Sequence, residues 1–321
     1  MDFLQFVNEV KKGLKQYFDE ETEIVVNSVR KNNGVMLTGI VIMEKGNHIA
    51  PTIYLESFYE AYKKEKNMQA ILYELVRIYK SNRIESVSNL DFFKDYETSK
   101  QKIYYKLINA KKNEALLKEV PFVPYLDLAI VFYCDCSNEL FGNAAILIKN
   151  SHLAMWGIDA EKLYQAAILN TPRNNPYEIK AMDTMMLELY AADIRRELER
   201  KHISYSEQWI EQLAAQMVEK EAPAGERTPM YVLTNTGRTH GAACILYHNL
   251  LDEFAKRIND NLYILPSSIH EIIIVPASLA GKASELREMV KEINETQVEE
   301  EEVLSDSVYF FNRSTKRLEL A

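Results

Sequence analysis

The apolar residues of the chain follow two spacings, one typical of helices and one typical of strands. In the segments that we predict as helices, apolar positions lie three and four apart and so share one helix face. These segments are residues 3–18, 57–64, 68–79, 98–118, 160–170, most of 178–220, 241–258 and 283–294. Asp159 and Ser206 stand where N-cap residues of two of these helices are expected.

One helical segment carries a regular apolar pattern. In residues 206–220 the apolar side chains predict a stripe that faces a core, made by Trp209, Ile210, Leu213, Met217 and Val218. We therefore expect this helix to be buried along one side.

Strand-like runs are separated by turn signals. Asn32-Asn33-Gly34 and Gly46-Asn47 divide three predicted strands, at residues 23–31, 34–43 and 48–55. Asp127–Asp135 is almost continuously apolar and predicts a central strand. Further strands are expected at 230–235, in a hairpin over 144–158 around Asn150-Ser151, and in hairpins over 262–276 and 308–320.

Three stretches share one order of elements, strand, turn, strand, helix, at residues 34–64, 145–171 and 262–296. We interpret them as reused β-β-α units. The predicted fold class is α+β, with two or three modules, each a small and mostly antiparallel sheet with helices packed on one face. The expected domains are residues 1–118, 119–222 and 223–321, the last two packed together, with 220–229 as the linker candidate.

Composition limits the class of protein. Hydrophobic residues make up 47% and charged residues 26% of the 321 positions, the balance of a soluble globular protein. The N-terminal segment is amphipathic and carries Asp2 and Glu9, so we do not interpret it as a signal peptide. No apolar run is long enough for a membrane span, and we expect no membrane partner.

The three cysteines, Cys134, Cys136 and Cys244, form no spaced framework, which favours a reducing cytoplasm. Cys134 and Cys136 would face the same side of a strand. Because no second cysteine pair accompanies them, we interpret them as small buried residues rather than half of a metal site. We expect no metal and no cofactor.

The segment PSSIHE, Pro266 to Glu271, is the first candidate for chemistry. A nucleophilic site would need His270 to reach Ser267 or Ser268 with one ring nitrogen and a carboxylate with the other. Side chains alternate along a strand, so His270 and Glu271 would point to opposite faces. We therefore predict that this segment is the tip of a hairpin, and we assign no catalytic residue.

The loop NTGRTHG, Asn235 to Gly241, is the second candidate. Amides exposed at the start of a helix, together with Arg238 and His240, would suit a phosphate or a carboxylate. The spacing of a phosphate-binding P-loop is absent, and a solvated connection is the alternative. The candidate ligand-binding residues are Asn235, Arg238, His240, Ser267, Ser268 and His270.

Positive charge gathers in one place. Five lysines, at 100, 102, 106, 111 and 112, lie in the predicted helix of residues 98–118. The interpretation we favour is a solvated helix face, and the alternative is a face for a partner or a nucleic acid. With a formal net charge of −9, the chain has no general basic stripe, so nucleic acid is not the expected partner.

Several segments resemble a known family. MYVLTN, LYILPSSIHEIIIVP and the N-terminal NNGVMLTGI and PTIYLE are similar to a family of proteins from gut Clostridia, domain of unknown function 5688. The resemblance covers nearly the whole chain. WGIDAEKLYQAAILN also resembles a second, wider bacterial family of unknown function. These resemblances imply a bacterial, cytoplasmic protein and imply no activity.

We therefore expect a cytoplasmic binding or adaptor protein that holds an unknown protein or small molecule and has no catalysis of its own. The alternative is a hydrolase-type enzyme whose site is assembled from distant segments, around Ser268 and His270 or around the 235–241 loop. A nucleic-acid-associated factor that uses the lysine-rich helix is a third hypothesis.

Overall fold

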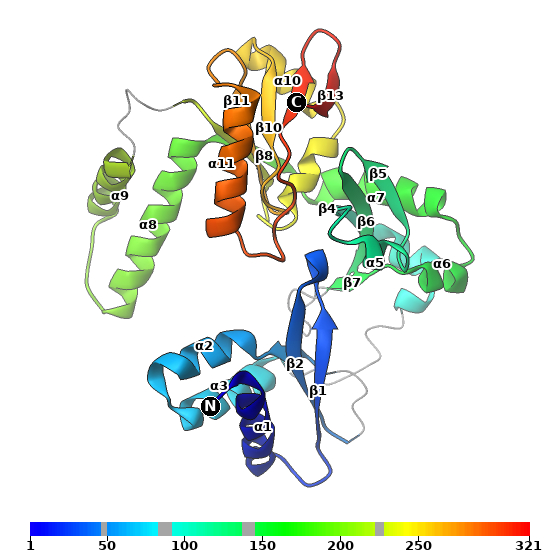
Figure 1. The fold of residues 1–321 in the computed structure, drawn as a ribbon, viewed down its shortest axis with the longest axis vertical. Helices are drawn as coiled ribbons and strands as arrows, with labels where there is room; N and C mark the ends of the chain where they lie inside the picture. The colour runs from blue at the N-terminus through cyan, green and yellow to red at the C-terminus, as the bar shows by residue number, and fades with distance from the viewer. Residues whose placement is uncertain (46–49, 83–91, 137–144, 222–227) are drawn as a thin grey trace. The chain divides into compact units, whose positions relative to one another are not determined.

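The structure of the protein is a computed structural model that describes residues 1–45, 50–82, 92–136, 145–221 and 228–321 (Figure 1). The predicted turn at Gly46-Asn47 and most of the predicted linker at 220–229 lie outside these residues. The helices and strands confirm the α+β class. In the described parts of the chain, no helix is both long enough and apolar enough to cross a lipid bilayer.

The chain forms two compact units. The first comprises Met1–Tyr104, Lys112–Phe122 and Val131–Asn170, and the second comprises Tyr105–Lys111, Val123–Ile130 and Thr171–Ala321. The second unit thus combines two short segments from the middle of the chain with the whole C-terminal part. The division into three consecutive domains stays a prediction.

The first unit contains a three-stranded antiparallel sheet in the order β1-β2-β3. Its strands are β1 (Glu23–Arg30), β2 (Met36–Met43) and β3 (Thr52–Tyr54). The helices that follow the apolar spacing are α1 (Phe3–Leu14), α2 (Glu56–Glu65) and α3 (Met68–Ser81). Buried side chains of α1 and α3 share one core with the sheet, in which Phe6, Leu14, Ile40 and Leu75 are fully buried, and partly buried side chains of α2 pack against this core. The local periodicity therefore predicted this part correctly.

A four-stranded sheet is made by β4 (Ile103–Asn109), β6 (Leu128–Asp135) and β5 (Phe122–Tyr125) in that order, with β7 (Ala145–Leu147) beside β6. Short helices accompany it: α4 (Tyr96–Ser99), α5 (Glu114–Leu117) and α6 (Asn150–Trp156). The longer α7 (Ala160–Asn174) is capped by Asp159, whose carboxylate accepts from the amide of Lys162 at 2.8 Å. The central strand and this cap were both predicted.

The predicted helix over residues 98–118 is wrong, because its centre is strand β4. The run from Ile103 to Ile108 is β-branched, aromatic and aliphatic, and only Lys106 within it is not buried. Burial on both sides favours a strand over the helix that the flanking charges suggested. The lysine-rich helix that a nucleic-acid-associated factor would need is therefore absent from these described residues.

The predicted hairpin over residues 144–158 is also wrong. Only Ala145–Leu147 is a strand, and Asn150 and Ser151 begin helix α6 instead of forming a turn. Gly157 ends this helix in the left-handed conformation, at φ 64°, as a C-terminal glycine commonly does. One of the three predicted β-β-α units is thereby lost, while β2-β3-α2 and the C-terminal unit remain.

The second unit contains a six-stranded sheet in the order β13-β12-β10-β11-β9-β8, antiparallel throughout. The strands are β8 (Tyr177–Ala181), β9 (Tyr231–Asn235), β10 (Leu262–Leu265), β11 (Ile272–Pro276), β12 (Tyr309–Asn312) and β13 (Arg317–Leu320). Strand β8 lies where the sequence predicted helix, so the helical prediction over 178–220 is wrong at its start.

Helices cover both faces of this sheet rather than one. Leu286 and Val290 of α11 (Ala283–Thr296) pack with Leu265 and Val275, and Figure 1 shows α11 in front of β10 and β11. On the other face, Phe254 of α10 (Leu250–Ile258) contacts the ring of Tyr231, with centroids 5.1 Å apart. The predicted helix over 241–258 is divided, because a 3₁₀ helix at Gly241–Leu246 precedes α10.

Two further helices, α8 (Met182–Arg200) and α9 (Glu207–Glu221), lie side by side (Figure 1). Arg195 of α8 pairs with Glu207 at the start of α9 at 2.6 Å, so the helices run antiparallel. Ser206 caps α9, as predicted, by accepting from the amide of Trp209 at 3.3 Å.

Candidate functional site

The PSSIHE segment joins β10 to β11, so the predicted hairpin is confirmed. Its connection is not a solvated turn, because Ser267 and Ser268 are buried. A segment from farther along the chain runs beside it: Leu304 donates its amide to the carbonyl of Ser267 at 2.8 Å, and Ser268 forms a strand-like bridge with Val303. The polar cluster is therefore packed between the β10–β11 connection and the segment around residues 302–305 of the second unit.

His270 makes no hydrogen bond to a serine through its ring. The backbone amide of His240 donates to Nδ1 of His270 at 3.3 Å, and Nε2 lies 3.3 Å from Oε1 of Glu302. An amide can only donate, so Nδ1 accepts and the neutral ring carries its proton on Nε2. Both ring nitrogens are therefore occupied, and neither is positioned to take a proton from Ser268.

The hydroxyl group of Ser268 instead hydrogen-bonds to the neighbouring backbone. Its oxygen accepts from the amide of His270 at 3.0 Å. Burial raises the pKa of Glu271 above its usual range, although His270 and Ser268 oppose this shift. Glu271 does not orient the imidazole of His270, since that contact is made by Glu302.

His240 stacks on His270, with ring centroids 5.9 Å apart and planes inclined by 13°. Burial lowers the pKa of His240 to about 3, and the nearby Lys106 and His270 act in the same direction. At neutral pH this ring is therefore uncharged. The two stacked rings lie at the centre of the cluster.

The loop from Asn235 to Gly241 is held by its own side chains. The buried amide group of Asn235 donates to the carbonyl of Thr239 at 2.8 Å and accepts from the amide of Thr239 at 3.3 Å. The amide of Arg238 binds the carbonyl of Asn235, and the amide of His240 binds His270. Since these amides are already bonded within the chain, they do not form an open cradle for a phosphate.

Arg238 is the most exposed of the six predicted residues and pairs with Glu188 of α8 at 2.8 Å. The structure therefore brings His240, Ser268 and His270 together, places Asn235 and Ser267 beside them as parts of the backbone network, and leaves Arg238 outside it. Their assignment as ligand-binding residues stays a prediction.

The sequence did not identify Glu302, Lys106 or Glu188 as members of this region. Glu302 belongs to the acidic run 299–302 and lies 32 positions from its partner His270. Lys106 sits on a strand that was interpreted as a helix. No local spacing links these residues to the two motifs, so only the tertiary structure reveals them.

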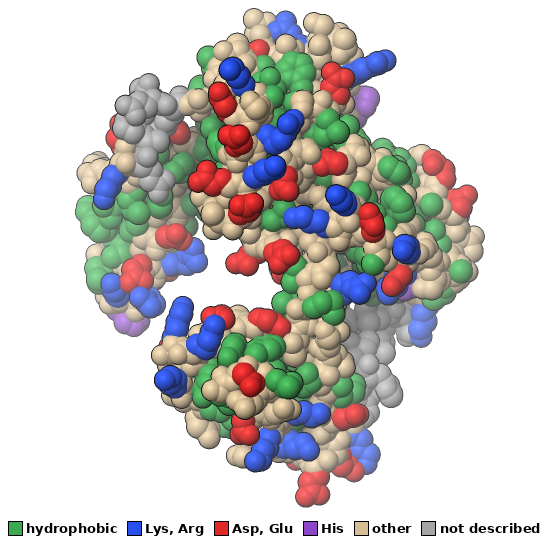
Figure 2. Space-filling model, viewed as in Figure 1, with side chains coloured by type: hydrophobic (Ala, Val, Ile, Leu, Met, Phe, Trp, Pro, Cys, Tyr) green, Lys and Arg blue, Asp and Glu red, His purple; other side chains and the backbone are tan. Residues whose placement is uncertain are grey.

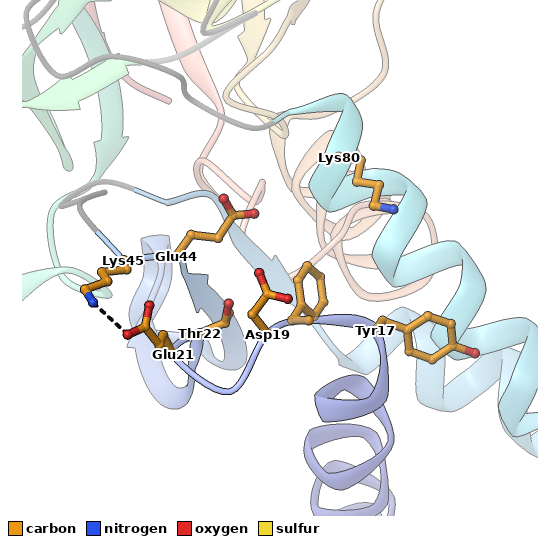
Figure 3. Close-up of a pocket in the computed structure, with 8 residues that line it drawn as sticks. Tyr17, Asp19, Glu21, Thr22, Glu44, Lys45 and Lys80 are labelled. Carbon is orange, nitrogen blue, oxygen red and sulfur yellow. Dashed lines mark hydrogen bonds and ion pairs between the residues drawn. The ribbon is translucent and has the colours of Figure 1, made fainter.

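A cavity in the first unit has a volume of about 640 Å³ (Figure 3). It is lined by Tyr17, Phe18, Asp19, Glu21, Thr22, Glu44, Lys45 and Lys80. Lys45 and Glu21 already neutralise each other at 2.6 Å. The remaining lining combines the rings of Tyr17 and Phe18 with polar side chains of both signs, so the cavity has no set of groups converging on one ligand.

Metal chemistry receives no support from the residues that the structure describes. Among them, no three His, Cys, Asp or Glu side chains are placed to hold a metal ion. Cys134, Cys136 and Cys244 are all buried free thiols, which agrees with their interpretation as small core residues.

The surface of α9 departs from its prediction. Ile210, Ala214 and Val218 are buried, but Trp209 is 48% exposed and Met217 is 38% exposed, so the predicted core stripe is only half correct. Leu213, four positions from each, is partly exposed. We call Trp209, Leu213 and Met217 the apolar stripe of α9. Figure 2 shows hydrophobic side chains gathered over the α8–α9 hairpin.

Fold and surface together define an α+β protein of two compact units, with a packed polar cluster and an exposed apolar stripe in the second. The chain belongs to a Family of unknown function (DUF5688), whose model matches residues 3–313. Searches of the curated proteins and of the solved structures each found no match.

Proposed function

We propose that this is a cytoplasmic binding or adaptor protein that works by associating with another protein through the apolar stripe of α9. The observation that carries the proposal is the exposure of Trp209 and Met217 beside a buried stripe on the same helix. An amphipathic helix gains stability by burying its whole apolar arc, and α8 covers only half of this one.

The exposed side chain of Trp209 further supports a role of this surface in protein binding. Large aromatic residues that are exposed in the free protein are enriched at the centres of protein interfaces, because they bury much area at little cost in conformational entropy. Trp209, Leu213 and Met217 recur every four residues along one side of α9. A helix or helical hairpin of a partner fits such a row.

The polar cluster supports binding over catalysis. The nitrogens of His270 are engaged by a backbone amide and by Glu302, so the ring is not free to act as a base toward Ser268. The buried free cysteines are consistent with the proposed reducing compartment.

A photo-crosslinking amino acid at position 217, introduced in the native host, tests the proposal. We expect a discrete covalent adduct with a protein, and Trp209→Glu should remove it. The matched control is the same amino acid at position 215, since Ala215 is exposed on another side of α9. Absence of any adduct from position 217 would contradict the proposal.

A hydrolase-type enzyme is the second candidate, favoured by one observation. The lowered pKa of His240 and the raised pKa of Glu271 occur beside Ser268, and shifted pKa values gather at active sites. A fluorophosphonate probe distinguishes the two functions. Labelling that Ser268→Ala abolishes would establish a reactive serine, and we expect none.

A further inference from the structure

We infer that the protein docking on the apolar stripe of α9 is a second copy of this chain, with the two α9 helices packed antiparallel. This inference rests on the proposed function and names its partner. It follows from how charge is distributed around α9.

Successive residues of an α-helix are about 100° apart, so residues four apart form strips along it. α9 carries four such strips. Ile210, Ala214 and Val218 form the buried strip, and the apolar stripe lies next to it. Beyond the apolar stripe comes a glutamine strip, Gln208, Gln212 and Gln216, and then an acidic strip, Glu207, Glu211 and Glu219.

The surface offered to a partner is therefore almost uncharged. The apolar stripe is bordered by the buried strip on one side and by three exposed glutamines on the other. The acidic strip lies on the far side of the glutamines, where Glu207 is already paired with Arg195.

This arrangement suits a second copy. In a two-fold dimer, residues near the axis face the same residues of the other copy, so a charge there would meet its own sign. Glutamine pairs can exchange hydrogen bonds without that repulsion. A cationic partner, by contrast, would be attracted to the acidic strip, which does not border the apolar stripe.

Lys220 sets the direction of packing. It falls within the arc of the apolar stripe, one turn beyond Met217, near the C-terminal end of α9. Parallel helices would bring the two Lys220 ammonium groups together. Antiparallel helices centred on Leu213 hold them roughly 20 Å apart at a rise of 1.5 Å per residue, well beyond the screening length of physiological salt.

The assembly that results is a familiar one. Two antiparallel α8–α9 hairpins, joined along α9, make a four-helix arrangement in which each apolar stripe is covered by the other. Isologous two-fold dimers are also the commonest form of self-association.

Sedimentation velocity of the purified full chain tests the inference. We expect a dimer, with Met217→Glu raising its dissociation constant at least 100-fold because each copy would then bury a carboxylate. Ala215→Glu adds the same charge on exposed α9 surface outside the stripe and should change the constant by less than about threefold. Far-ultraviolet circular dichroism verifies that both variants stay folded.

Cysteine cross-linking tests the direction of packing. Under mild oxidation we expect Leu213→Cys to form an inter-chain disulfide, since this residue lies nearest the axis, and Lys220→Cys to form none. The native cysteines are buried and do not compete. A disulfide at position 220 and none at position 213 would overturn the antiparallel arrangement.

The remaining outcomes separate this inference from the proposed function. A dimer that is insensitive to Met217→Glu overturns the inference. A monomeric chain whose position-217 adduct contains a different protein overturns the inference and leaves the proposed function standing. A monomeric chain without any adduct overturns both.

Discussion

The backbone amide of His240 donates a hydrogen bond to Nδ1 of His270, 30 residues farther along the chain, across 3.3 Å. This bond connects the two polar motifs that stand out in the sequence. It also fixes the tautomer of His270 and directs its Nε2 proton toward Glu302. The relationship is that of a structural clamp, in which the imidazole joins the 235–241 loop, the 266–271 connection and the acidic run.

The clamp predicts a stability effect. His270→Ala should lower the free energy of unfolding by about 2 kcal/mol, because it leaves the amide of His240 without its acceptor. His270→Asn should cost less, since the asparagine oxygen can replace Nδ1. Urea denaturation measures both, with His248→Ala on an exposed histidine as the control. Equal stability of His270→Ala and His248→Ala would contradict the clamp.

The buried ring of His240 predicts a dependence of stability on pH. Its pKa falls from 6.5 to about 3 on folding, so the unfolded chain binds more protons between these values. The stabilisation is fully present above pH 6.5 and is lost as the pH falls toward 3. His240→Asn, which tolerates the positive φ of this position, should flatten the pH dependence of the urea midpoint in this window.

Glu271 provides a comparison of opposite sign. Burial raises the pKa of this carboxyl above 4.5, so the folded protein holds its proton more tightly than the unfolded chain does. Its contribution is present below pH 4.5 and is lost as the pH rises through the folded pKa. Glu271→Gln should therefore gain stability relative to the native protein at neutral pH. A gain confined to acid would contradict this assignment.

Local patterns predicted elements whose packing is set by neighbours in sequence. Helices α1 and α3 follow from apolar spacing, and the β10–β11 hairpin follows from two apolar runs around a polar connection. Strand β4 was missed because lysines before and after it suggested an exposed helix, whereas burial on both faces decided its conformation. Helix α6 was missed because Asn150 and Ser151 suit a turn and a helix start equally well.

The sequence identified the two motifs of the candidate site, but it did not predict the contacts that their residues make. The two motifs were identified from their residue types, yet Glu302 comes from the acidic run 299–302, and nothing in the local sequence indicates that it contacts His270. The apolar stripe of α9 shows the converse. The sequence pattern predicted burial for Trp209 and Met217, and the single chain leaves both exposed, which is why the pattern indicates a partner.

Asp127 is the centre of a second hydrogen-bonded cluster, for which we also predict an effect on stability. Its carboxylate accepts hydrogen bonds from the hydroxyls of Ser305 at 2.5 Å, Ser307 at 3.0 Å and Tyr309. Burial beside this carboxylate raises the pKa of Tyr309, so the phenol stays protonated and donates. Asp127→Ala should lower the free energy of unfolding by about 3 kcal/mol, because it leaves three hydroxyls to find other acceptors.

Tyr309→Phe is the matched variant for this cluster. It removes a single donor and keeps the buried ring, so its cost should be only about 1 kcal/mol. Thermal and urea unfolding of the two variants measure the difference. If Asp127→Ala were no more destabilising than Tyr309→Phe, the carboxylate would not be the hub of the cluster.

Gly241 and Gly237 lie in the same loop, and we expect an added Cβ to affect stability very differently at the two positions. A Cβ at this position would lie 2.2 Å from Oγ1 of Thr234 and 2.4 Å from the carbonyl oxygen of His270, which is backbone and cannot turn aside. Gly241→Ala should therefore separate the 235–241 loop from the hairpin and lower the free energy of unfolding by about 3 kcal/mol. At Gly237 the nearest atom would be 3.5 Å away, an ordinary contact, so Gly237→Ala should be nearly neutral. Urea denaturation of both variants checks the contrast. Equal stabilities would mean that the loop and the hairpin do not pack as closely as the structure requires.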